Sequence, residues 1–188
     1  MQNETDLALV KRCLLGEAEG YEALLSRYRN RVFSYVLRLT QNPADAEDIA
    51  QEAFVKAFSR LDGYDSRYPF SSWLFRIAHN CCMDFFRAHE TGNISMDDED
   101  HPFEVADSAP EPERWAELRL SQENIEHLLA SLPIHYREVV LLRYKEDLSC
   151  SETAQALGIP EGTVKVRLFR ARELLREKLS ALGVAVAA

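Results

Sequence analysis

The chain has 188 residues, of which 46% are hydrophobic and 28% charged, a balance typical of folded globular proteins and unlike that of disordered ones. No apolar run approaches the roughly 18 residues that span a bilayer, and the polar, acidic N-terminus does not resemble a secretory signal. The four cysteines lack the paired spacing of a disulfide framework. These features predict a cytoplasmic protein that does not insert into a membrane.

Apolar residues recur at helical spacing along almost the whole chain, so we expect an all-α protein. The first half should form helices over residues 5–15, 19–40, 42–61 and 70–89, with a loop at 62–69. Gly16 should close the first helix, and Asn42–Pro43 should end the second and begin the third. The core face expected for the fourth helix consists of Phe70, Leu74, Ile77, Cys81, Phe85 and Ala88.

The segment 91–112 differs from the rest of the chain. It holds seven acidic residues, no lysine or arginine, and three prolines, which predicts a flexible linker. A second helical block should follow, with helices over residues 113–131, 133–146, 149–157 and 160–182. We therefore expect two small helical domains, residues 1–90 and 113–188, joined by an acidic linker.

The formal net charge of -9 argues against a nucleic-acid-binding protein when the chain is taken whole. The distribution of charge reverses this conclusion. Without the seven acidic residues of the linker, the remaining chain carries only -2, and residues 160–178 hold six basic residues against three acidic ones. Local charge matters more than the sum, because salt screens charges beyond about 8–10 Å.

The C-terminal part of the chain has the pattern of a helix-turn-helix. Ser149 and Glu152 have the spacing of a capping box. Gly158 can adopt the left-handed conformation that ends a helix, and Pro160 suits the first turn of the next. A short helix, a tight glycine turn and a basic second helix are typical of DNA-binding helix-turn-helix domains.

The second helix of this pair should bury one face and expose another. Its expected core residues are Val164, Leu168, Ala171 and Leu175. The opposite side carries Val166, Phe169 and Arg170, flanked by Thr163, Lys165, Arg167 and Arg172. Exposed apolar side chains on a basic helix suit contacts with the edges of DNA bases, while the flanking lysine and arginine side chains suit contacts with phosphates. The alternative is a basic surface helix without a ligand.

The helix expected over 42–61 has an acidic stripe opposite its apolar side. The polar residues are Asp45, Asp48, Gln51, Glu52 and Lys56, and Phe54 and Phe58 lie toward the far edge of the apolar side. Such a stripe either keeps the helix soluble or docks it onto a basic partner. The spacing leaves both interpretations open.

The helix expected over 70–89 has an exposed edge that mixes aromatic, amide and basic groups. These are Trp73, Arg76, Asn80 and Arg87, and the preceding segment adds Arg60, Tyr64, Arg67 and Tyr68. This combination can stack an unpaired base and follow a nucleic-acid strand. The equally weighted alternative is that Trp73 is buried in the core and that the arginines are scattered over the surface without a ligand.

Three motifs together resemble the extracytoplasmic-function sigma factors, small bacterial transcription initiation factors. Residues 45–57 (DAEDIAQEAFVKA) resemble the polymerase-docking helix of that family, and residues 70–80 (FSSWLFRIAHN) resemble its promoter-melting helix. Residues 132–148 and 158–172 resemble its promoter-recognition domain. The similarity covers nearly the whole chain, with the motifs in the family's order.

The resemblance implies partners and roles. The residues implied to dock on the β′ clamp helices of RNA polymerase are Asp45, Asp48, Gln51, Glu52 and Phe54. Those implied at the melted -10 element are Arg60, Tyr64, Trp73, Arg76 and Asn80, with Tyr64 and Asn80 holding a flipped base. Those implied at the -35 element are Thr163, Lys165, Val166, Arg167, Phe169 and Arg170. Val166 stands where many members have serine, and Tyr64 where phenylalanine is common.

The same resemblance implies further properties of the whole protein. The second domain would contact the polymerase β flap, and the linker would lie in the RNA exit region. An anti-sigma factor would hold the protein inactive until a stress signal arrives, and the free protein would be a monomer without a cofactor.

Two other classes of function compete with this one. A stand-alone helix-turn-helix regulator would require a dimer for two half-sites, and it leaves the first four helices without a role. An enzyme or metal sensor would use His79, Cys81, Cys82 and His89, but we expect Cys81 to face inward and His79 to point away. No catalytic motif is evident, so we predict neither enzyme activity nor a bound metal.

Overall fold

A computed structural model describes residues 4–89 and 122–181 of the chain. These residues form helices and contain no strand, which confirms the all-α fold. They belong to two compact units, one comprising residues 4–89 and 155–158 and the other residues 122–154 and 159–181. The predicted linker at 91–112 lies outside the described residues. Among the described helices, none has the length and apolar character needed to cross a membrane.

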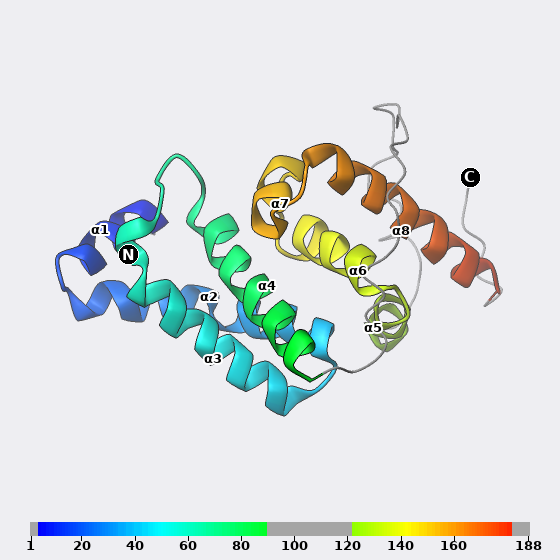
Figure 1. Ribbon diagram of the computed structural model, residues 1–188, viewed down its shortest axis with the longest axis horizontal. Helices are drawn as coiled ribbons and strands as arrows, with labels where there is room; N and C mark the ends of the chain where they lie inside the picture. The colour runs from blue at the N-terminus through cyan, green and yellow to red at the C-terminus, as the bar shows by residue number, and fades with distance from the viewer. Residues whose placement is uncertain (1–3, 90–121, 182–188) are drawn as a thin grey trace. The chain divides into compact units, whose positions relative to one another are not determined.

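The first unit is a bundle in which the long helix α2 contacts the other three helices (Figure 1). Its elements are α1 (Asp6–Leu14), α2 (Ala18–Thr40), α3 (Pro43–Ser59), the 3-10 turn η1 (Leu61–Gly63) and α4 (Phe70–Ala88). Helices α3 and α4 also pack against each other. The two helices that carry the predicted polymerase and -10 surfaces are therefore held by one shared core.

The helix ends follow the chemistry that the sequence predicts. The Asn42 side chain accepts a hydrogen bond from the backbone N–H of Ala44 at 2.9 Å, and Pro43 occupies the first turn of α3. Gly16 follows α1 with a φ of +82°, a conformation that costs glycine little. Helix α2, however, ends at Gln41, which takes the left-handed conformation with a φ of +57°. No sequence signal predicts this cap, because glutamine is not a usual residue there.

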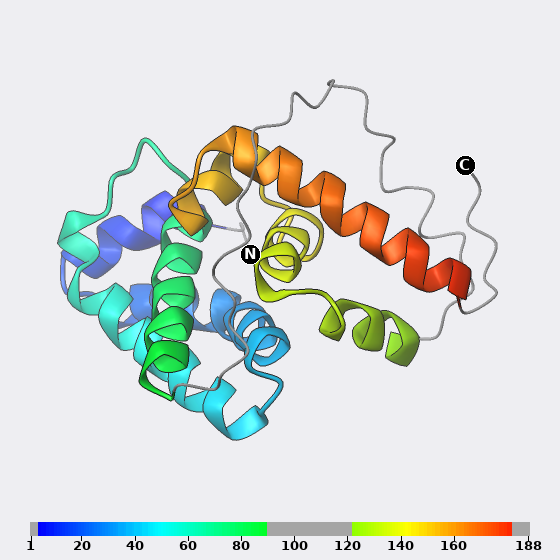
Figure 2. The same cartoon turned by 45° about the vertical axis from the view of Figure 1, so that its right-hand side comes forward.

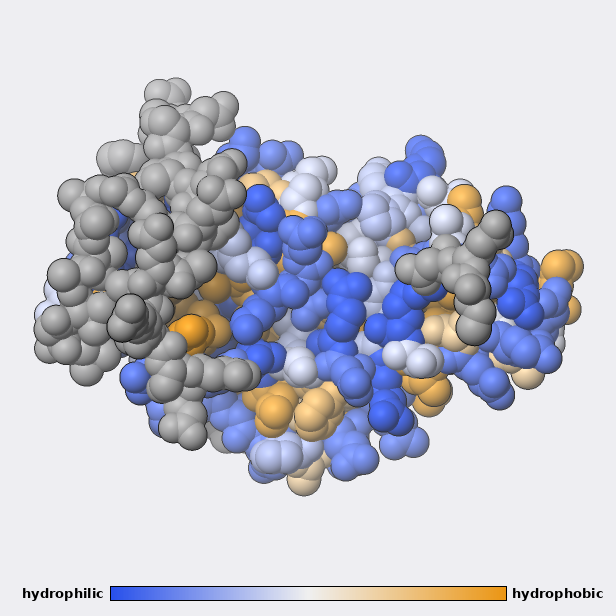
Figure 3. Space-filling view, turned by 180° about the vertical axis from the view of Figure 1, so that it is seen from behind, coloured by the Kyte–Doolittle hydropathy of each residue, from blue (hydrophilic) through white to orange (hydrophobic). Residues whose placement is uncertain are grey.

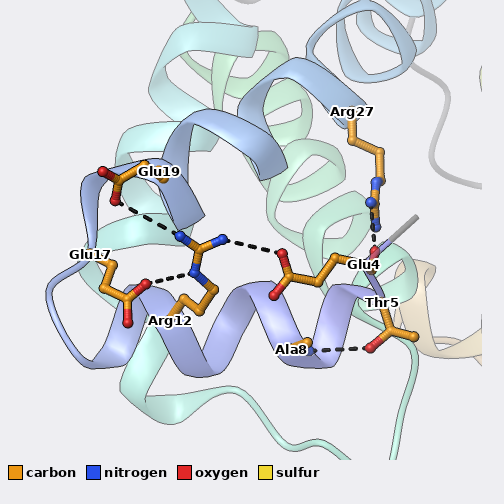
Figure 4. Close-up of polar contacts among 7 residues, drawn as sticks. All are labelled: Glu4, Thr5, Ala8, Arg12, Glu17, Glu19 and Arg27. Carbon is orange, nitrogen blue, oxygen red and sulfur yellow. Dashed lines mark hydrogen bonds and ion pairs between the residues drawn. The ribbon is translucent and has the colours of Figure 1, made fainter. Parts of the chain in front are cut away.

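A polar network fastens the start of the chain to the α1–α2 hairpin (Figure 4). The Arg12 guanidinium lies 2.6 Å from the Glu17 carboxylate, 3.2 Å from Glu4 and 3.9 Å from Glu19. Arg27 on α2 donates to the backbone carbonyl of Glu4 at 2.7 Å. Because Arg12 and Arg27 reach residues on both sides of the hairpin turn, this network fixes the position of α1 on α2.

The predicted core face of α4 is wrong in part. Phe70, Leu74 and Cys81 are buried as expected, but Ala88 is exposed. A second buried row, which the prediction omitted, consists of Phe75, Ala78 and Cys82. Helix α4 contacts both α2 and α3, so it buries two neighbouring faces instead of the single stripe expected for a surface helix.

The C-terminal helices include the helix-turn-helix. They are α5 (Gln122–Ala130), α6 (Ile134–Val140), the π-helical turn η3 (Leu141–Lys145), α7 (Cys150–Leu157) and α8 (Glu161–Ala181). All but residues 155–157 of α7 belong to the second unit. The helix expected over 133–146 is regular only to Val140. Its last turn widens, so that the Glu146 N–H donates to the Leu141 carbonyl at 3.1 Å. Of the helix expected over 113–131, only the part from residue 122 onward is described.

Helix α8 runs beside α6, and the contact between them forms much of this core (Figure 2). The fully or nearly fully buried residues here include Val139 and Leu142 as well as Val164, Leu168 and Leu179 of α8. The buried guanidinium of Arg137 donates to the backbone carbonyls of Ala130 and Leu132, the latter at 2.8 Å. Arg137 therefore satisfies carbonyls at the end of α5, and burial lowers its pKa.

Candidate functional site

The exposed face of α3 is acidic and polar, as predicted. Asp48, Gln51 and Glu52 are exposed, and Asp45 is partly buried at the start of the helix. The sequence prediction missed Val55, whose side chain continues this face one turn later and is 62% exposed. We call Asp48, Gln51, Glu52 and Val55 the α3 face. It combines negative charge with an apolar contact, a composition suited to a protein partner.

Two residues support this face from its edge and from below. Phe54 is only 6% exposed and its ring lies 5.9 Å from that of Phe58, so it belongs to the core beneath the face. Lys56 pairs with Glu52 at 2.7 Å and approaches Asp84 of α4 at 4.0 Å. The Glu52 hydrogen bond raises the pKa of Lys56. Lys56 thus orients one acidic side chain of the α3 face, while Asp48 projects without a described ion pair of its own.

Aromatic side chains gather where the loop after η1 meets the start of α4. The ring of Tyr64 lies 5.4 Å from that of Trp73 and 5.7 Å from that of Phe70, and Phe70 lies 5.6 Å from Trp73. The Tyr64 hydroxyl donates to the Tyr68 carbonyl at 2.5 Å, which holds the loop in place. We call Tyr64, Phe70 and Trp73 the aromatic cluster. Phe70 is 1% exposed and supports the other two rings, so the half-buried Tyr64 and Trp73 are the members that can stack on an unpaired base.

A hydrogen bond from α1 braces this cluster. Phe70 packs edge-on against Tyr28 of α2 at 5.5 Å, and the Tyr28 hydroxyl donates to the Asp6 carboxylate. Asp6 is also held by Arg27. Burial, followed by the bond to Asp6, raises the pKa of Tyr28, and burial raises that of Tyr64. Both phenols therefore stay neutral in the physiological range and keep their hydroxyl hydrogens.

The polar members of the predicted -10 set lie on the surface. Arg60, Arg76 and Asn80 are exposed, whereas Tyr64 and Trp73 are half-buried. Trp73, Arg76 and Asn80 follow one another at helical spacing along α4, and Asn80 lies about 10 Å along the axis from Trp73. The structure thus brings Tyr64 and Trp73 together and places Asn80 two turns further along the helix.

The helix-turn-helix has the local geometry that the sequence predicts. The Ser149 backbone N–H donates to the Glu152 carboxylate at 2.7 Å, and the Glu152 N–H donates to the Ser149 hydroxyl at 3.2 Å, a reciprocal capping box. Gly158 has a φ of +68°. The Ile159 N–H donates back to the Ala154 carbonyl at 3.1 Å. These bonds fix the turn that leads into α8.

The two faces of α8 are divided as the helical wheel predicts. The predicted core residues are buried: Val164, Leu168, Ala171 and Leu175. On the other side Lys165 and Arg170 are exposed, Phe169 is 39% exposed, and Thr163 and Val166 are half-buried. Lys165 pairs with Glu161 at 3.3 Å on the surface. An aromatic ring and two basic groups are therefore exposed on one face of α8.

Arg167 differs from the other predicted -35 residues. Its side chain is only 18% exposed and lies 3.2 Å from the carboxylate of Glu138, whose side chain is 6% exposed. Burial raises the pKa of Glu138 to about 8, while the charge of Arg167 opposes that rise. Further along α8, Arg172 donates to the Tyr144 hydroxyl at 2.9 Å. The sequence prediction missed Glu138, which lies on a helix outside the helix-turn-helix motif.

The cysteines and histidines do not assemble a metal site in the described part of the chain. Cys81 and Cys82 are buried, and burial raises the pKa of Cys81. His79 is only 9% exposed, so the expectation that it points away from the core is wrong. Residues 4–89 and 122–181 contain no group of three or more ligand side chains placed to hold a metal ion.

The face of the molecule seen in Figure 3 is mainly hydrophilic where it is coloured. In the view of Figure 3, blue residues cover most of the coloured surface and orange ones form small, separate groups. The exposed large apolar residues include Val55 and Phe169, which lie on the two predicted binding helices. Single exposed apolar side chains are common, so Val55 and Phe169 indicate a binding surface only together with the polar residues around them.

Comparison with known proteins agrees with this arrangement. The Sigma-70 region 2 family matches residues 24–91, and the Sigma-70, region 4 family matches residues 122–175. The ECF RNA polymerase sigma factor SigW of Bacillus subtilis is 34% identical over 178 residues, which cover 90% of this chain and 94% of SigW.

Solved structures share the fold. CnrH, solved in complex with the cytosolic domain of CnrY, has a TM-score of 0.69 and 25% identity, covering 95% of this chain and 99% of CnrH. The Bartonella quintana sigma factor RpoE, solved with the anti-sigma factor NepR, has a TM-score of 0.64 and 23% identity. That match covers 87% of this chain and 98% of RpoE.

Two helical modules in this order, one with an acidic helix beside an aromatic cluster and one with a basic helix-turn-helix, define a transcription initiation factor. The chain belongs to the extracytoplasmic-function (ECF) sigma factors of bacterial RNA polymerase. It is therefore not an enzyme, and the alternative of a stand-alone regulator is not favoured, because both sigma modules are present.

Proposed function

We propose that this sigma factor binds core polymerase through the first unit and divides promoter recognition between its two units. Residues 1–90 would act as region 2 and residues 113–188 as region 4, joined by residues 91–112. The observation that carries the proposal is the separation of charge: the α3 face is acidic, whereas α8 exposes Lys165 and Arg170 beside Phe169. Opposite charges on separate modules suit a protein partner at one and DNA at the other.

The α3 face is the proposed contact with the β′ clamp helices. Asp48, Gln51 and Glu52 would supply the polar contacts and Asp45 the negative charge at the helix start. Val55 would add apolar area to the contact. Phe54 is buried, so its proposed role is to support the α3 face from within the core. This division follows from exposure, because a side chain must be accessible to contact a partner directly.

The aromatic cluster and the exposed edge of α4 are proposed to hold the melted -10 strand. Tyr64 and Trp73 would provide stacking surfaces, and Arg60 and Arg76 would contact phosphates. Asn80 would hydrogen-bond to an extruded base, since its amide both donates and accepts. Base extrusion costs a few kcal/mol, roughly what stacking and hydrogen bonding of one base return.

The exposed face of α8 is proposed to enter the major groove of the -35 element. Lys165 and Arg170 would contact phosphates or guanine edges, and Val166 and Phe169 would pack on thymine methyl groups. Thr163, at the start of the helix, would reach the backbone. In the polymerase complex, this unit would also contact the β flap.

We also propose that a dedicated anti-sigma factor controls the protein in the cytoplasm in response to stress, and that the free protein is a monomer. An anti-sigma factor is present in the solved structure of the Bartonella quintana relative. A partner that covers the acidic α3 face would compete directly with polymerase, because the face is small and both partners would need the same exposed side chains.

In vitro transcription tests the proposal. Purified core polymerase is supplied with the intact chain and a genomic DNA library, and RNA 5′ ends are mapped. We expect new start sites preceded by a shared pair of sequence elements. If the chain neither co-elutes with core polymerase nor changes its start sites, the proposal is refuted; a stable dimer that binds duplex DNA without polymerase would favour the stand-alone regulator.

A further inference from the structure

The pair formed by Glu138 and Arg167 joins two elements whose relative position matters for the -35 contact. Glu138 lies on α6, and Arg167 lies in α8 between the proposed DNA-contacting residues Val166 and Phe169. The Arg167 guanidinium donates to the Glu138 carboxylate at 3.2 Å. The contact lies within the second unit and spans 29 positions of sequence, so it is a tertiary link and not a helix-internal pair.

The burial of the pair makes it a rigid link. The side chain of Glu138 is 6% exposed and that of Arg167 is 18% exposed. By comparison, the surface pair Lys165–Glu161 has side chains that are 45% and 48% exposed. Exposed pairs contribute little because water and salt screen them. A buried carboxyl group is costly to leave without a hydrogen-bond partner whether or not it is ionised, so Glu138 restrains Arg167 strongly.

The position of Arg167 decides what this restraint controls. Residues one and two positions away on a helix point roughly 100° and 200° around its axis. A link that fixes the direction of Arg167 therefore also fixes the directions in which Val166, Phe169 and Arg170 project. The apolar core beneath Val164 and Leu168 resists separation of the helices, and the hydrogen bond of Arg167 adds a directional restraint to these non-directional contacts.

We infer that Glu138 is a positioning residue for promoter recognition, and that Arg167 sets the rotation of α8 on α6 instead of contacting DNA phosphates. The inference rests on the proposed recognition of the -35 element by α8. Arg167, predicted to contact DNA, thereby becomes a structural residue, and Glu138, which lies outside the helix-turn-helix, acquires a role in promoter recognition. The inference also predicts that both partners act as a unit, whereas Arg170 acts alone.

A double-mutant cycle in the intact holoenzyme tests this inference. The variants are Glu138→Leu, Arg167→Met and the double variant, which replace the pair with apolar groups of similar size. The readout is the ratio of binding to a promoter with an intact -35 element over one with that element scrambled. We expect each single variant to lower this ratio about tenfold and the double variant to lower it no further, because coupled residues are non-additive.

The salt dependence of binding separates positioning from contact. Arg170→Ala, which removes a proposed phosphate or base contact, should lower the slope of log K against log salt by about one. Arg167→Met should leave that slope at the wild-type value. Glu173→Gln, which weakens the exposed pair with Arg176 further along α8, is the matched control and should change neither the ratio nor the slope.

Three results would overturn the inference: a slope lowered by about one in Arg167→Met, additive losses in the double variant, or wild-type discrimination by Glu138→Leu. If a single variant unfolds, the double variant still decides. It removes the carboxyl group and the guanidinium together, so it should be more stable than either single variant, and undiminished discrimination would then refute the role of the pair. If Arg170→Ala also leaves discrimination intact, the proposed -35 contact fails instead.

Discussion

Two nearby residues of α8, Leu168 and Arg170, should separate stability from promoter recognition. Leu168 is only 3% exposed, whereas Arg170 is exposed. Leu168→Ala should therefore weaken the fold of the second unit, and Arg170→Ala should weaken promoter recognition. The helix is the same in both cases, so differences in helix propensity cannot explain opposite outcomes.

The size of the stability loss follows from burial. Truncation of Leu168 removes three buried carbon atoms, worth about 2.4 kcal/mol at about 0.8 kcal/mol each. The cavity that remains brings the expected cost to about 2.7–5 kcal/mol. A unit of about 60 residues has a total stability of about 3–9 kcal/mol. Each kcal/mol shifts the Tm of such a unit by about 4–8 °C, so we expect a decrease of at least about 10 °C.

The Arg170→Ala variant should behave in the opposite way. Loss of an exposed side chain should change the stability by less than about 0.5 kcal/mol. Loss of its DNA contact should weaken promoter binding by about 1–3 kcal/mol, or about 5- to 150-fold. Thermal unfolding of the full chain and holoenzyme binding to -35 variants measure the two effects. An unstable Arg170→Ala, or a Leu168→Ala as stable as wild type, would refute the assignment of faces.

Four further outcomes are expected. Asn80→Ala should bind core polymerase normally but open the promoter poorly, and a wild-type bubble in permanganate footprinting would contradict this. Asp48→Lys should weaken polymerase binding at least about tenfold, because it places a like charge against a basic partner. The control is Glu22→Lys, which makes the same charge change on the exposed side of α2. Equal losses of polymerase binding in both variants would indicate a non-specific charge effect. Gly20→Ala should destabilise the first unit despite the better helix propensity of alanine, because a Cβ there would lie 3.0 Å from the Cys13 backbone nitrogen. The control is Gly162→Ala, which has open space around it and should be neutral or stabilising by up to about 1 kcal/mol. Urea unfolding of the two variants measures this difference in stability. The stability of the second unit should fall as the pH rises from about 5 to 8, because burial raises the pKa of Glu138 and the folded state keeps a proton that the unfolded state releases. Glu138→Gln should remove this pH-dependent part of the stability. If the pH profile is unchanged in that variant, Glu138 is not the group that titrates.

The sequence by itself determined the features that depend on local spacing. Hydrophobic periodicity predicted the buried and exposed faces of α8, and the capping box at Ser149 and Glu152 formed as predicted. The cap at Asn42 and the left-handed Gly158 followed from the chemistry of those residue types. All of these depend on residues within about four positions, where helix geometry leaves few alternatives.

Only the tertiary structure decided which helix packs against two other helices and which side chain pairs with a residue far away in the sequence. Helix α4 packs against both α2 and α3, so its second buried row of Phe75, Ala78 and Cys82 was not evident from one stripe. Arg167 has the sequence pattern of a DNA contact, yet it pairs with Glu138, 29 positions away. Periodicity specifies the direction of a side chain from its own helix, but burial depends on what the rest of the chain places in that direction.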